Sequence, residues 1–317
     1  MSQPPRHFLD LWKLEGSDLR AILEDAKARK AARKGWPQGR VDSDAPARDR
    51  VLAMIFEKNS TRTRFSFDAA MRQLGGDVII SNAVDMQLGR GEPIEDTARV
   101  LSRMVDAVMI RANNHQDVER LALSSTIPII NGLSDKSHPC QILADLLTIE
   151  EHRGPIAGKT LAYVGDGNNV CASFIHAAPK LGYRLKIACP AVYHPDLADL
   201  ARAQREQGLV EAGDDPREAV KDADVVITDT WVSMGDTDHD ERLDALEPYQ
   251  VDERLMDIAK PDAVFLHCLP AHRGDEVVDE VLDGPQSRIW PQAQNRMHAA
   301  RGLLAWLVAE AAGEKPA

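Results

Sequence analysis

The sequence lacks any apolar run long enough to span a bilayer, and its first residues are not followed by the apolar segment of a signal peptide. Only four of its 317 residues are cysteine, and no two of them have C-x-x-C spacing. The small number of cysteines and the absence of this spacing argue against a disulfide framework and against a zinc site. We therefore expect a cytoplasmic protein that does not contact a membrane.

The sequence also lacks an excess of basic residues. Lysine and arginine number 38 against 50 aspartates and glutamates, so the formal net charge is −12. This balance excludes a broad nucleic-acid surface, which needs a basic face that displaces counterions. Any anion that binds this protein must be held by a local cluster of cations, which favours a small ligand over a polymer.

Short apolar runs and helix-like segments alternate along the whole chain. The runs expected to form strands are Val51–Phe56, Val78–Ser81, Ala107–Arg111, Ile127–Asn131, Thr160–Val164, Arg184–Ala188, Val225–Thr228 and Ala263–Leu266. Ser17 is expected to cap the first helix. The alternation predicts an α/β protein with two lobes, each a parallel β-sheet flanked by helices. A helix from Pro139 to about His152 joins the lobes, and a C-terminal helix, about Ala293–Glu310, returns to the first lobe.

The stretch Ser60-Thr61-Arg62-Thr63 follows the first strand and opens a helix. The N–H groups of a helix N-terminus, together with hydroxyl groups and a guanidinium, can hold a phosphate from several sides. The alternative is that Ser60 only caps the helix while Arg62 and Arg64 are solvated. The stretch is not a P-loop, because GxxxxGK[ST] is absent.

Arg111 ends another predicted strand, and His138-Pro139-Cys140-Gln141 opens the joining helix. An arginine, a histidine and a glutamine amide together could polarise a carbonyl group and orient an attached amide. Taken singly, Arg111 is better interpreted as part of a surface ion pair and His138 as a structural histidine.

Two motifs of the second half have open interpretations. Gly165-Asp166-Gly167-Asn168-Asn169 follows a strand as a dinucleotide motif would, but a valine replaces the third glycine and no acidic residue ends the next strand. Asn168 and Asn169 suit the polar groups of a small zwitterionic ligand better. Cys268 is either a reactive thiol or a packed side chain.

Six motifs in register carry a family resemblance. They are Phe56–Thr63, Arg111, His138–Gln141, Asp229 with Ser233-Met234-Gly235, His267–Pro270, and Arg296. The set resembles the aspartate/ornithine carbamoyltransferase family, and its ornithine-specific members in particular, over essentially the whole chain. The resemblance implies transfer of the carbamoyl group of carbamoyl phosphate to the δ-amine of L-ornithine, giving L-citrulline and phosphate, as in arginine biosynthesis. It also implies that no metal or organic cofactor takes part.

The resemblance assigns roles to individual residues. Carbamoyl phosphate would be bound by Ser60, Thr61, Arg62, Thr63, Gln87, Arg111, His138, Pro139, Cys140, Gln141, Cys268, Leu269 and Arg296. Ornithine would be bound by Asn169, Asp229, Ser233 and Met234. The catalytic residues would be Arg62, Arg111, His138, Asp229 and Cys268.

The resemblance also implies how the chain is divided and assembled. Residues 1–145, with the helix 293–317 packed on them, would form the carbamoyl phosphate-binding domain, and 146–292 the ornithine-binding domain. The family implies a homotrimer, or a multiple of trimers, in which a loop around Gln87 reaches a neighbouring subunit. The sequence does not distinguish arginine synthesis from arginine breakdown.

The acceptor has to be inferred separately, because relatives use aspartate, acylated ornithine or putrescine. Ser233-Met234-Gly235 resembles the ornithine version, and Gln87 stands where the aspartate enzymes carry a lysine. Another amine acceptor and, less favoured, a nucleotide-dependent oxidoreductase stay as alternatives.

Three smaller features accompany the motifs. Asn59 stands where many relatives have proline and should alter mainly the stiffness of the turn. Asp236–Glu241 reads as a solvated acidic loop, and Arg64 as a structural ion pair.

Overall fold

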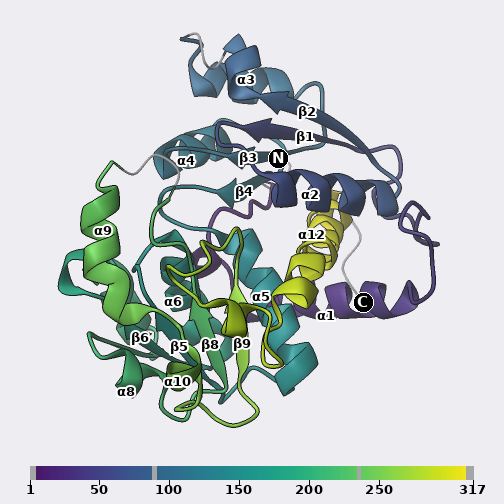
Figure 1. Ribbon diagram of the computed structural model, residues 1–317. Coiled ribbons are helices and arrows are strands. Elements are labelled where there is room, and N and C mark those ends of the chain that lie inside the picture. Colours follow the sequence, from purple (N-terminus) through teal and green to yellow (C-terminus); the bar gives the residue numbers. More distant parts are fainter. Residues whose placement is uncertain (1–4, 88–90, 234–236, 312–317) are drawn as a thin grey trace. The chain divides into compact units, whose positions relative to one another are not determined.

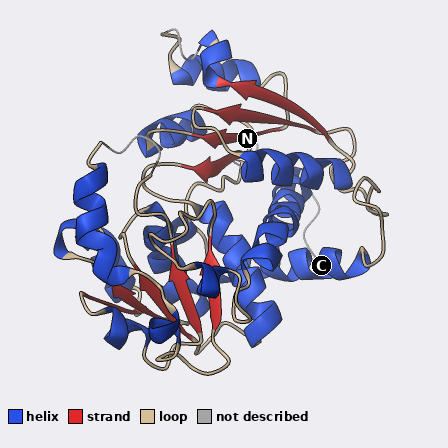
Figure 2. Ribbon diagram, in the orientation of Figure 1, coloured by secondary structure: helices blue, strands red, loops and turns tan. Residues whose placement is uncertain are grey.

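The computed structural model describes residues 5–87, 91–233 and 237–311. The chain divides into two compact units, Met1–Ala144 with Gln294–Ala317, and Asp145–Ala293. Each unit is built around one parallel β-sheet with helices beside it (Figures 1 and 2). The predicted α/β class is therefore confirmed.

The first unit has a four-stranded sheet in the order β2-β1-β3-β4. Its strands are β1 (Val51–Phe56), β2 (Asp77–Asn82), β3 (Ala107–Arg111) and β4 (Ile129–Leu133), and its helices include α2 (Thr61–Gln73), α3 (Ile94–Leu101) and α4 (His115–Leu123). Side chains such as Ile55, Val108 and Ile110 form a buried cluster with residues of α3 and α4. Because all pairings are parallel, the carboxyl ends of β1, β3 and β4 lie at one edge of the sheet.

The C-terminal helix α12 (Ile289–Ala311) packs against α1 (Gly16–Ala32) within the first unit. A Cβ atom added at Gly302 would lie 2.5 Å from the carbonyl oxygen of Ile22, so glycine permits this close approach. The buried Arg301 bonds Asp42, which also accepts from Arg33. The expected return of the last helix to the first lobe is thus confirmed.

The start of α1 differs from the expectation. The helix begins at Gly16, and Ser17 lies inside it, so Ser17 is not the cap. The residue in the capping position is Glu15, whose side chain makes no capping hydrogen bond.

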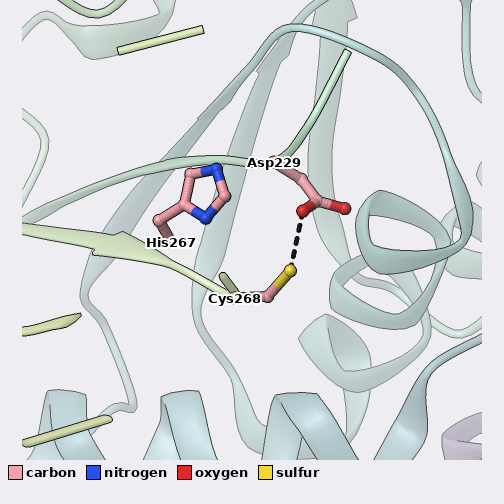
Figure 3. A group of neighbouring side chains, drawn as sticks. All are labelled: Asp229, His267 and Cys268. Carbon is pink, nitrogen blue, oxygen red and sulfur yellow. Dashed lines mark hydrogen bonds between the residues drawn. The ribbon is translucent and has the colours of Figure 1, made fainter. Parts of the chain in front are cut away.

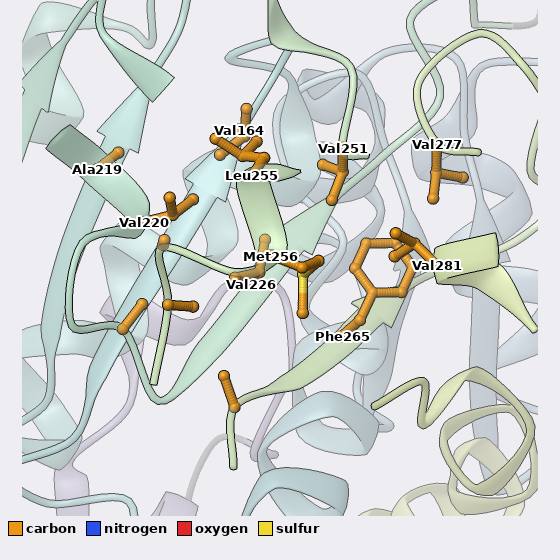
Figure 4. Close-up of a cluster of buried hydrophobic side chains, with 14 of the residues drawn as sticks. Val164, Ala219, Val220, Val226, Val251, Leu255, Met256, Phe265, Val277 and Val281 are labelled. Carbon is orange, nitrogen blue, oxygen red and sulfur yellow. The ribbon is translucent and has the colours of Figure 1, made fainter. Parts of the chain in front are cut away.

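The second unit has a five-stranded sheet in the order β7-β6-β5-β8-β9. Its strands are β5 (Thr160–Val164), β6 (Arg184–Ala188), β7 (Leu209–Gly213), β8 (Val225–Thr228) and β9 (Val264–His267). Its helices are α6 (Asn169–Leu181), α7 (Leu197–Arg205), α8 (Pro216–Val220), α9 (His239–Leu246), α10 (Glu253–Met256) and α11 (Asp279–Leu282). Figure 4 shows part of its core, where Phe265, Met256 and Val226 pack together.

The remaining elements are short or cross the division between the units. Helix α5 (Pro139–Arg153) contains the boundary at Ala144, as the predicted joining helix does. Short 3₁₀ turns occupy Leu11–Lys13, Ala83–Asp85, Ala191–Tyr193 and Glu247–Tyr249. Among the described residues, no helix combines the length and the apolar character that crossing a membrane requires.

Part of the acidic stretch is helical, which corrects the expectation of a loop. His239, Asp240 and Glu241 form the first turn of α9, where negative side chains are favoured by the helix dipole. Asp236 lies outside the described residues. Arg242 anchors this helix through a bond to Asp166 and through its Nε, which donates to the carbonyl oxygen of Trp231 at 2.6 Å.

Candidate active site

The N-terminus of α2 in the first unit is organised around Thr63. Ser60 is the N-cap, and its Oγ accepts from the backbone N–H of Thr63 at 3.1 Å. The expected helix start is therefore present, with Thr61 exposed and Arg62 partly exposed in its first turn. The cap satisfies one N–H of the turn and leaves the N-terminal dipole directed at this edge of the sheet.

Two buried guanidinium groups converge on the Thr63 hydroxyl. Arg111, the last residue of β3, donates from Nη1 to Thr63 Oγ1 at 3.1 Å. Arg296, on α12, donates from Nη2 to the same oxygen at 2.9 Å and also bonds Gln141 Oε1. Each arginine side chain is nearly inaccessible to solvent. Two guanidinium groups that meet at a helix N-terminus make a positive region that suits a bound anion.

His138 lies beside these cations and is buried. Burial holds its pKa well below the ordinary value of 6.5, and the charges of Arg296 and Arg111 lower it further. Arg62 acts in the same direction, which places its charge near the ring. The imidazole is therefore neutral at physiological pH, and a neutral ring can still donate one hydrogen bond to a carbonyl oxygen.

The residues after His138 have distinct environments. Pro139 is the first residue of α5, where proline is favoured. The buried thiol of Cys140 donates to the carbonyl oxygen of Asn131 at 3.3 Å. Burial raises the pKa of Cys140 to about 12, so this thiol stays protonated and is no nucleophile.

The structure thus brings Ser60, Thr63, Arg111, Gln141 and Arg296 into one group of contacts. The exposed Gln87 follows the 3₁₀ turn Ala83–Asp85 and is in none of the hydrogen bonds just described. Cys268 and Leu269 belong to the second unit.

In the second unit, polar groups gather around Asp229, which follows β8 and is almost fully buried. The thiol of Cys268, just after β9, donates to its Oδ1 at 2.7 Å (Figure 3). The Nδ2 of Asn168 donates to its Oδ2 at 2.8 Å. A buried carboxylate that accepts from two neutral donors keeps its negative charge available for a cationic ligand.

Asn168 supports Asp229 and also caps α6. Its Oδ1 accepts from the backbone N–H groups of Val170 and Cys171 and from the hydroxyl of Tyr163. Since Oδ1 accepts from three donors and Nδ2 donates to Asp229, the Asn168 amide is held in place as a support for the carboxylate. This role was missed at the sequence level, where its amide resembled a ligand-binding group.

Of the other three residues expected to bind ornithine, two lie in the described part of the chain. Asn169 opens α6 and, like Ser233, is partly exposed. Met234 lies outside the described residues.

The glycines that resembled a dinucleotide motif have a packing role. A Cβ atom at Gly167 would lie 2.5 Å from the backbone nitrogen of Pro195 and 2.6 Å from the carbonyl oxygen of Tyr193. This loop is therefore closed by another backbone segment, which leaves no room there for a pyrophosphate. The packing argues against the oxidoreductase alternative.

Among the described residues of the second unit, two groups of side chains have spacings that could suit a metal ion. They are Asp229, His267 and Cys268, and His272, Asp275 and Glu276. In the first group, His267 uses Nδ1 to accept from the backbone N–H of Leu269 at 2.8 Å and Nε2 to bond Glu276 at 3.0 Å. A metal ion there would have to break one of these bonds, so hydrogen bonding explains the group better.

Arg64 does not form the expected ion pair in the described part of the chain. Its Nη2 donates to the amide oxygen of Asn82 at 2.9 Å, and its guanidinium lies 4.5 Å from the ring centroid of Phe56. An amide and an aromatic ring, rather than a carboxylate, hold this side chain.

The buried histidines predict a pH-dependent stability. Burial, with Arg301 and Lys30, lowers the pKa of His298 from 6.5 to about 3, and His138 shifts in the same direction. Since the unfolded chain takes up these protons first, their stabilising contribution is complete above pH 6.5 and is lost as the pH falls below it. Between pH 6.5 and 5, His298 alone is expected to lower the free energy of unfolding by about 2 kcal/mol.

Urea unfolding in phosphate-free buffer at pH 7 and pH 5 measures this loss. His298→Asn serves as the control, because it should flatten the pH dependence by the share of His298. Equal unfolding free energies for the unsubstituted protein at the two pH values would contradict neutral burial of these rings.

Comparison with known proteins covers nearly the whole chain. Residues 6–151 match the family model described as aspartate/ornithine carbamoyltransferase, carbamoyl-P binding domain, and residues 157–307 match the Asp/Orn binding domain of that family. The ornithine carbamoyltransferase of Caulobacter vibrioides is 76% identical over 95% of this chain and 97% of its own length. That of Rhodopseudomonas palustris is 55% identical over 95% and 96%.

Solved structures agree with these sequence relatives. Ornithine carbamoyltransferase from Pyrococcus furiosus superposes with a TM-score of 0.89 at 49% identity, covering 96% of this chain and 97% of that one. An anabolic ornithine carbamoyltransferase from Campylobacter jejuni gives a TM-score of 0.88 at 38% identity, covering 96% and 99%. Together with the buried arginine cluster and the acidic group at Asp229, these matches show that the chain belongs to the aspartate/ornithine carbamoyltransferase family.

Proposed function

We propose that the protein transfers the carbamoyl group of carbamoyl phosphate to the δ-amine of L-ornithine, giving L-citrulline and phosphate. The observation that carries this proposal is the convergence of Arg111 and Arg296 on Thr63 at the N-terminus of α2. Such a set of donors suits a doubly charged phosphate group. The curated relatives reported above are named ornithine carbamoyltransferases, which supports ornithine as the acceptor.

In this proposal the first unit holds carbamoyl phosphate and the second holds ornithine. The phosphate is bound by Ser60, Thr61, Arg62, Thr63 and Arg111, with Gln87 supplied by a neighbouring subunit. The carbamoyl end is oriented by His138, Pro139, Cys140, Gln141, Leu269 and Arg296. Ornithine is bound by Asn169, Asp229, Ser233 and Met234, with Cys268 beside the amine.

The reaction needs a deprotonated amine as the nucleophile and a site that stabilises negative charge on the leaving phosphate. The amine has to lose a proton before it attacks, because an alkyl ammonium has a pKa of about 10. That first proton goes to solvent, and the nitrogen then forms a bond to the carbonyl carbon while the bond from that carbon to the phosphate oxygen breaks with its electron pair. The nitrogen gives its second proton to the departing phosphate, so that a neutral ureido group and hydrogen phosphate are formed. The neutral ring of His138 and the Arg111 guanidinium stabilise the developing oxyanion, while Arg62 and the helix N-terminus receive the charge of the leaving phosphate.

A single assay tests the proposed function and its nearest alternatives. The purified protein is given carbamoyl phosphate with ornithine, aspartate, N-acetylornithine or putrescine, and both phosphate and the ureido product are measured. We expect a product only with ornithine, because Asp229 offers a negative charge to an amine and its position in the family motif is that of the ornithine-specific members. Product with another acceptor and none with ornithine would overturn the assignment.

We also propose a homotrimer as the functional assembly. Exposed apolar side chains occur on α2, on the edge strand β2 and just after it, namely Phe65, Ile79 and Val84, close in sequence to the exposed Gln87. An edge strand and exposed apolar groups are features that a subunit interface would cover. Sedimentation equilibrium should give three copies of the 34.9 kDa chain, or a multiple of three.

We place the reaction in the cytoplasm and in arginine biosynthesis. All four cysteines are free thiols, which is typical of a reducing compartment. The anabolic assignment printed for the Campylobacter jejuni relative supports the biosynthetic direction. Growth of an arginine auxotroph that lacks this activity, after expression of the protein, would test both statements.

A further inference from the structure

The loop that carries Cys268 is held at both ends by one carboxylate oxygen. Glu276 is fully buried, and its Oε1 accepts from the His267 ring at Nε2, 3.0 Å away. The same oxygen accepts from the backbone N–H of His272 at 2.7 Å. Glu276 itself is fixed, because its carbonyl oxygen accepts from the backbone N–H of Val251 at 3.0 Å.

The His267 ring carries this constraint to the residue after the cysteine. Its Nδ1 accepts from the backbone N–H of Leu269 at 2.8 Å, so the proton of the neutral ring is on Nε2 and is donated to Glu276. Leu269 has a φ of 59°, a conformation that disfavours a residue with a Cβ atom. The bond from His267 therefore compensates for an unfavourable backbone conformation.

Neighbouring contacts set the loop against Asp229. Cys268 donates to Asp229, and the hydroxyl of Thr230 bonds Nδ1 of His272 at 3.0 Å. The loop is thus bonded near its start and at its far end to consecutive residues after β8. Release of Glu276 or His267 would let the cysteine move away from the carboxylate.

We propose that Glu276 and His267 are positioning residues that hold the Cys268 thiol on Asp229 and so set the geometry of the amine site. They act through the loop and do not themselves touch a substrate. The consequence for carbamoyl transfer rests on the proposed function, whereas the consequence for Cys268 does not.

The reactivity of Cys268 toward iodoacetamide measures the position of the thiol without any assay of activity. The other three cysteines, Cys140, Cys171 and Cys189, are buried, and Cys268 is partly exposed. A thiol held by a hydrogen bond to a carboxylate is not free to turn toward a reagent, so Cys268 in the unsubstituted protein should react slowly. Mass spectrometry of the digested protein then gives the rate of alkylation at this one cysteine.

Two pairs of variants separate positioning from simple loss of packing. His267→Asn keeps an acceptor for the N–H two residues on, as in an Asx turn, while His267→Gln reaches Glu276 but cannot close this turn. Glu276→Gln keeps an oxygen at the place of Oε1, and Glu276→Ala removes it. We expect alkylation about fivefold faster or more in His267→Gln and Glu276→Ala, and within about twofold of the unsubstituted rate in the other two.

The value of kcat should fall most in the same two variants in which Cys268 is alkylated faster. We expect kcat with ornithine to fall by about tenfold or more in His267→Gln and Glu276→Ala, and by no more than about threefold in His267→Asn and Glu276→Gln. KM for carbamoyl phosphate should change little in His267→Asn and Glu276→Gln, because these two variants keep Leu269 in place. If the unsubstituted protein makes no citrulline, the proposed function fails, while the alkylation series still tests the positioning role.

His176→Asn is the matched control for loss of a buried histidine. His176 is equally buried in the second unit, where its Nε2 lies 2.9 Å from Asp199. This variant should lose stability yet leave the alkylation rate of Cys268 unchanged. Folding of every variant is checked by circular dichroism, and if Glu276→Ala does not fold, His267→Gln alone decides. Unchanged alkylation and unchanged kcat in a folded His267→Gln protein would overturn the proposal.

Discussion

Replacing Arg62 with alanine is expected to lower kcat/KM for carbamoyl phosphate by about 10³-fold. Arg62 is in the first turn of α2, and its charge lowers the pKa of His138, so it lies close to the proposed carbonyl-polarising group. Its loss removes charge-assisted bonds to the phosphate both when the substrate binds and when negative charge collects on the leaving group. Initial rates over a range of carbamoyl phosphate concentrations at saturating ornithine give the value.

Arg64→Ala is the matched control, because the same change is made two residues further along the same helix. Its guanidinium is already engaged by Asn82 and by the ring of Phe56. Its loss should cost about 0.5–1 kcal/mol of stability and leave kcat/KM within about threefold. Equal losses of activity in the two variants would show that the helix, and not the Arg62 charge, is what matters.

The sheet strands that could be predicted are those that contain a run of apolar residues. Val51–Phe56 and Val225–Thr228 are continuous apolar runs, and the structure places strands at these residues. β7, in contrast, has an exposed leucine, a glutamate and a glycine among its five residues at the edge of the sheet, so no apolar run marks it. The first turn of α9 was not predicted either, because its acidic residues are typical of a solvated loop.

The residues at the strand ends could be predicted, but their convergence could not. Arg111 is the last residue of one strand and His138 follows another, and the carboxyl ends of parallel strands are where ligands bind. Arg296 bonds Thr63 although the two residues are 233 positions apart in the sequence, and no local sequence pattern can predict such a contact. Glu276 was not predicted for a different reason, because an acidic residue is expected to be solvated and this one is fully buried.

The missing third glycine already disfavoured a dinucleotide site in the sequence, but the sequence could not show why the glycines are there, because two physical causes produce the same pattern. Gly167 is required by a neighbouring backbone segment and not by a pyrophosphate, as the 2.5 Å approach of a Cβ to the Pro195 nitrogen shows. A close backbone contact and a ligand contact both exclude a side chain. Only the packed structure distinguishes the two.

Replacing Asp229 with asparagine is expected to lower kcat/KM for ornithine by about 10³-fold. The variant removes the buried negative charge that would attract the ammonium group, and it also creates a conflict of donors. Both carboxylate oxygens now accept, one from Cys268 and one from Asn168, whereas the new NH₂ group would face one of those donors with a donor of its own. Steady-state kinetics with ornithine as the varied substrate measures the loss, and carbamoyl phosphate binding by calorimetry should change by less than about threefold.

Asp224→Asn provides the comparison at the opposite end of the same strand. Asp224 precedes β8 as Asp229 follows it, is just as buried, and is bonded by Arg153 and Lys260. Loss of this paired charge should cost about 3 kcal/mol of stability while kcat/KM for ornithine stays within about threefold. Because the two variants remove equally buried charges from one strand, a loss confined to Asp229→Asn would assign the ornithine site to the carboxyl end of β8. Similar losses in both variants would instead mean that the sheet had been destabilised, and Asp229 would have no special role in binding the amine.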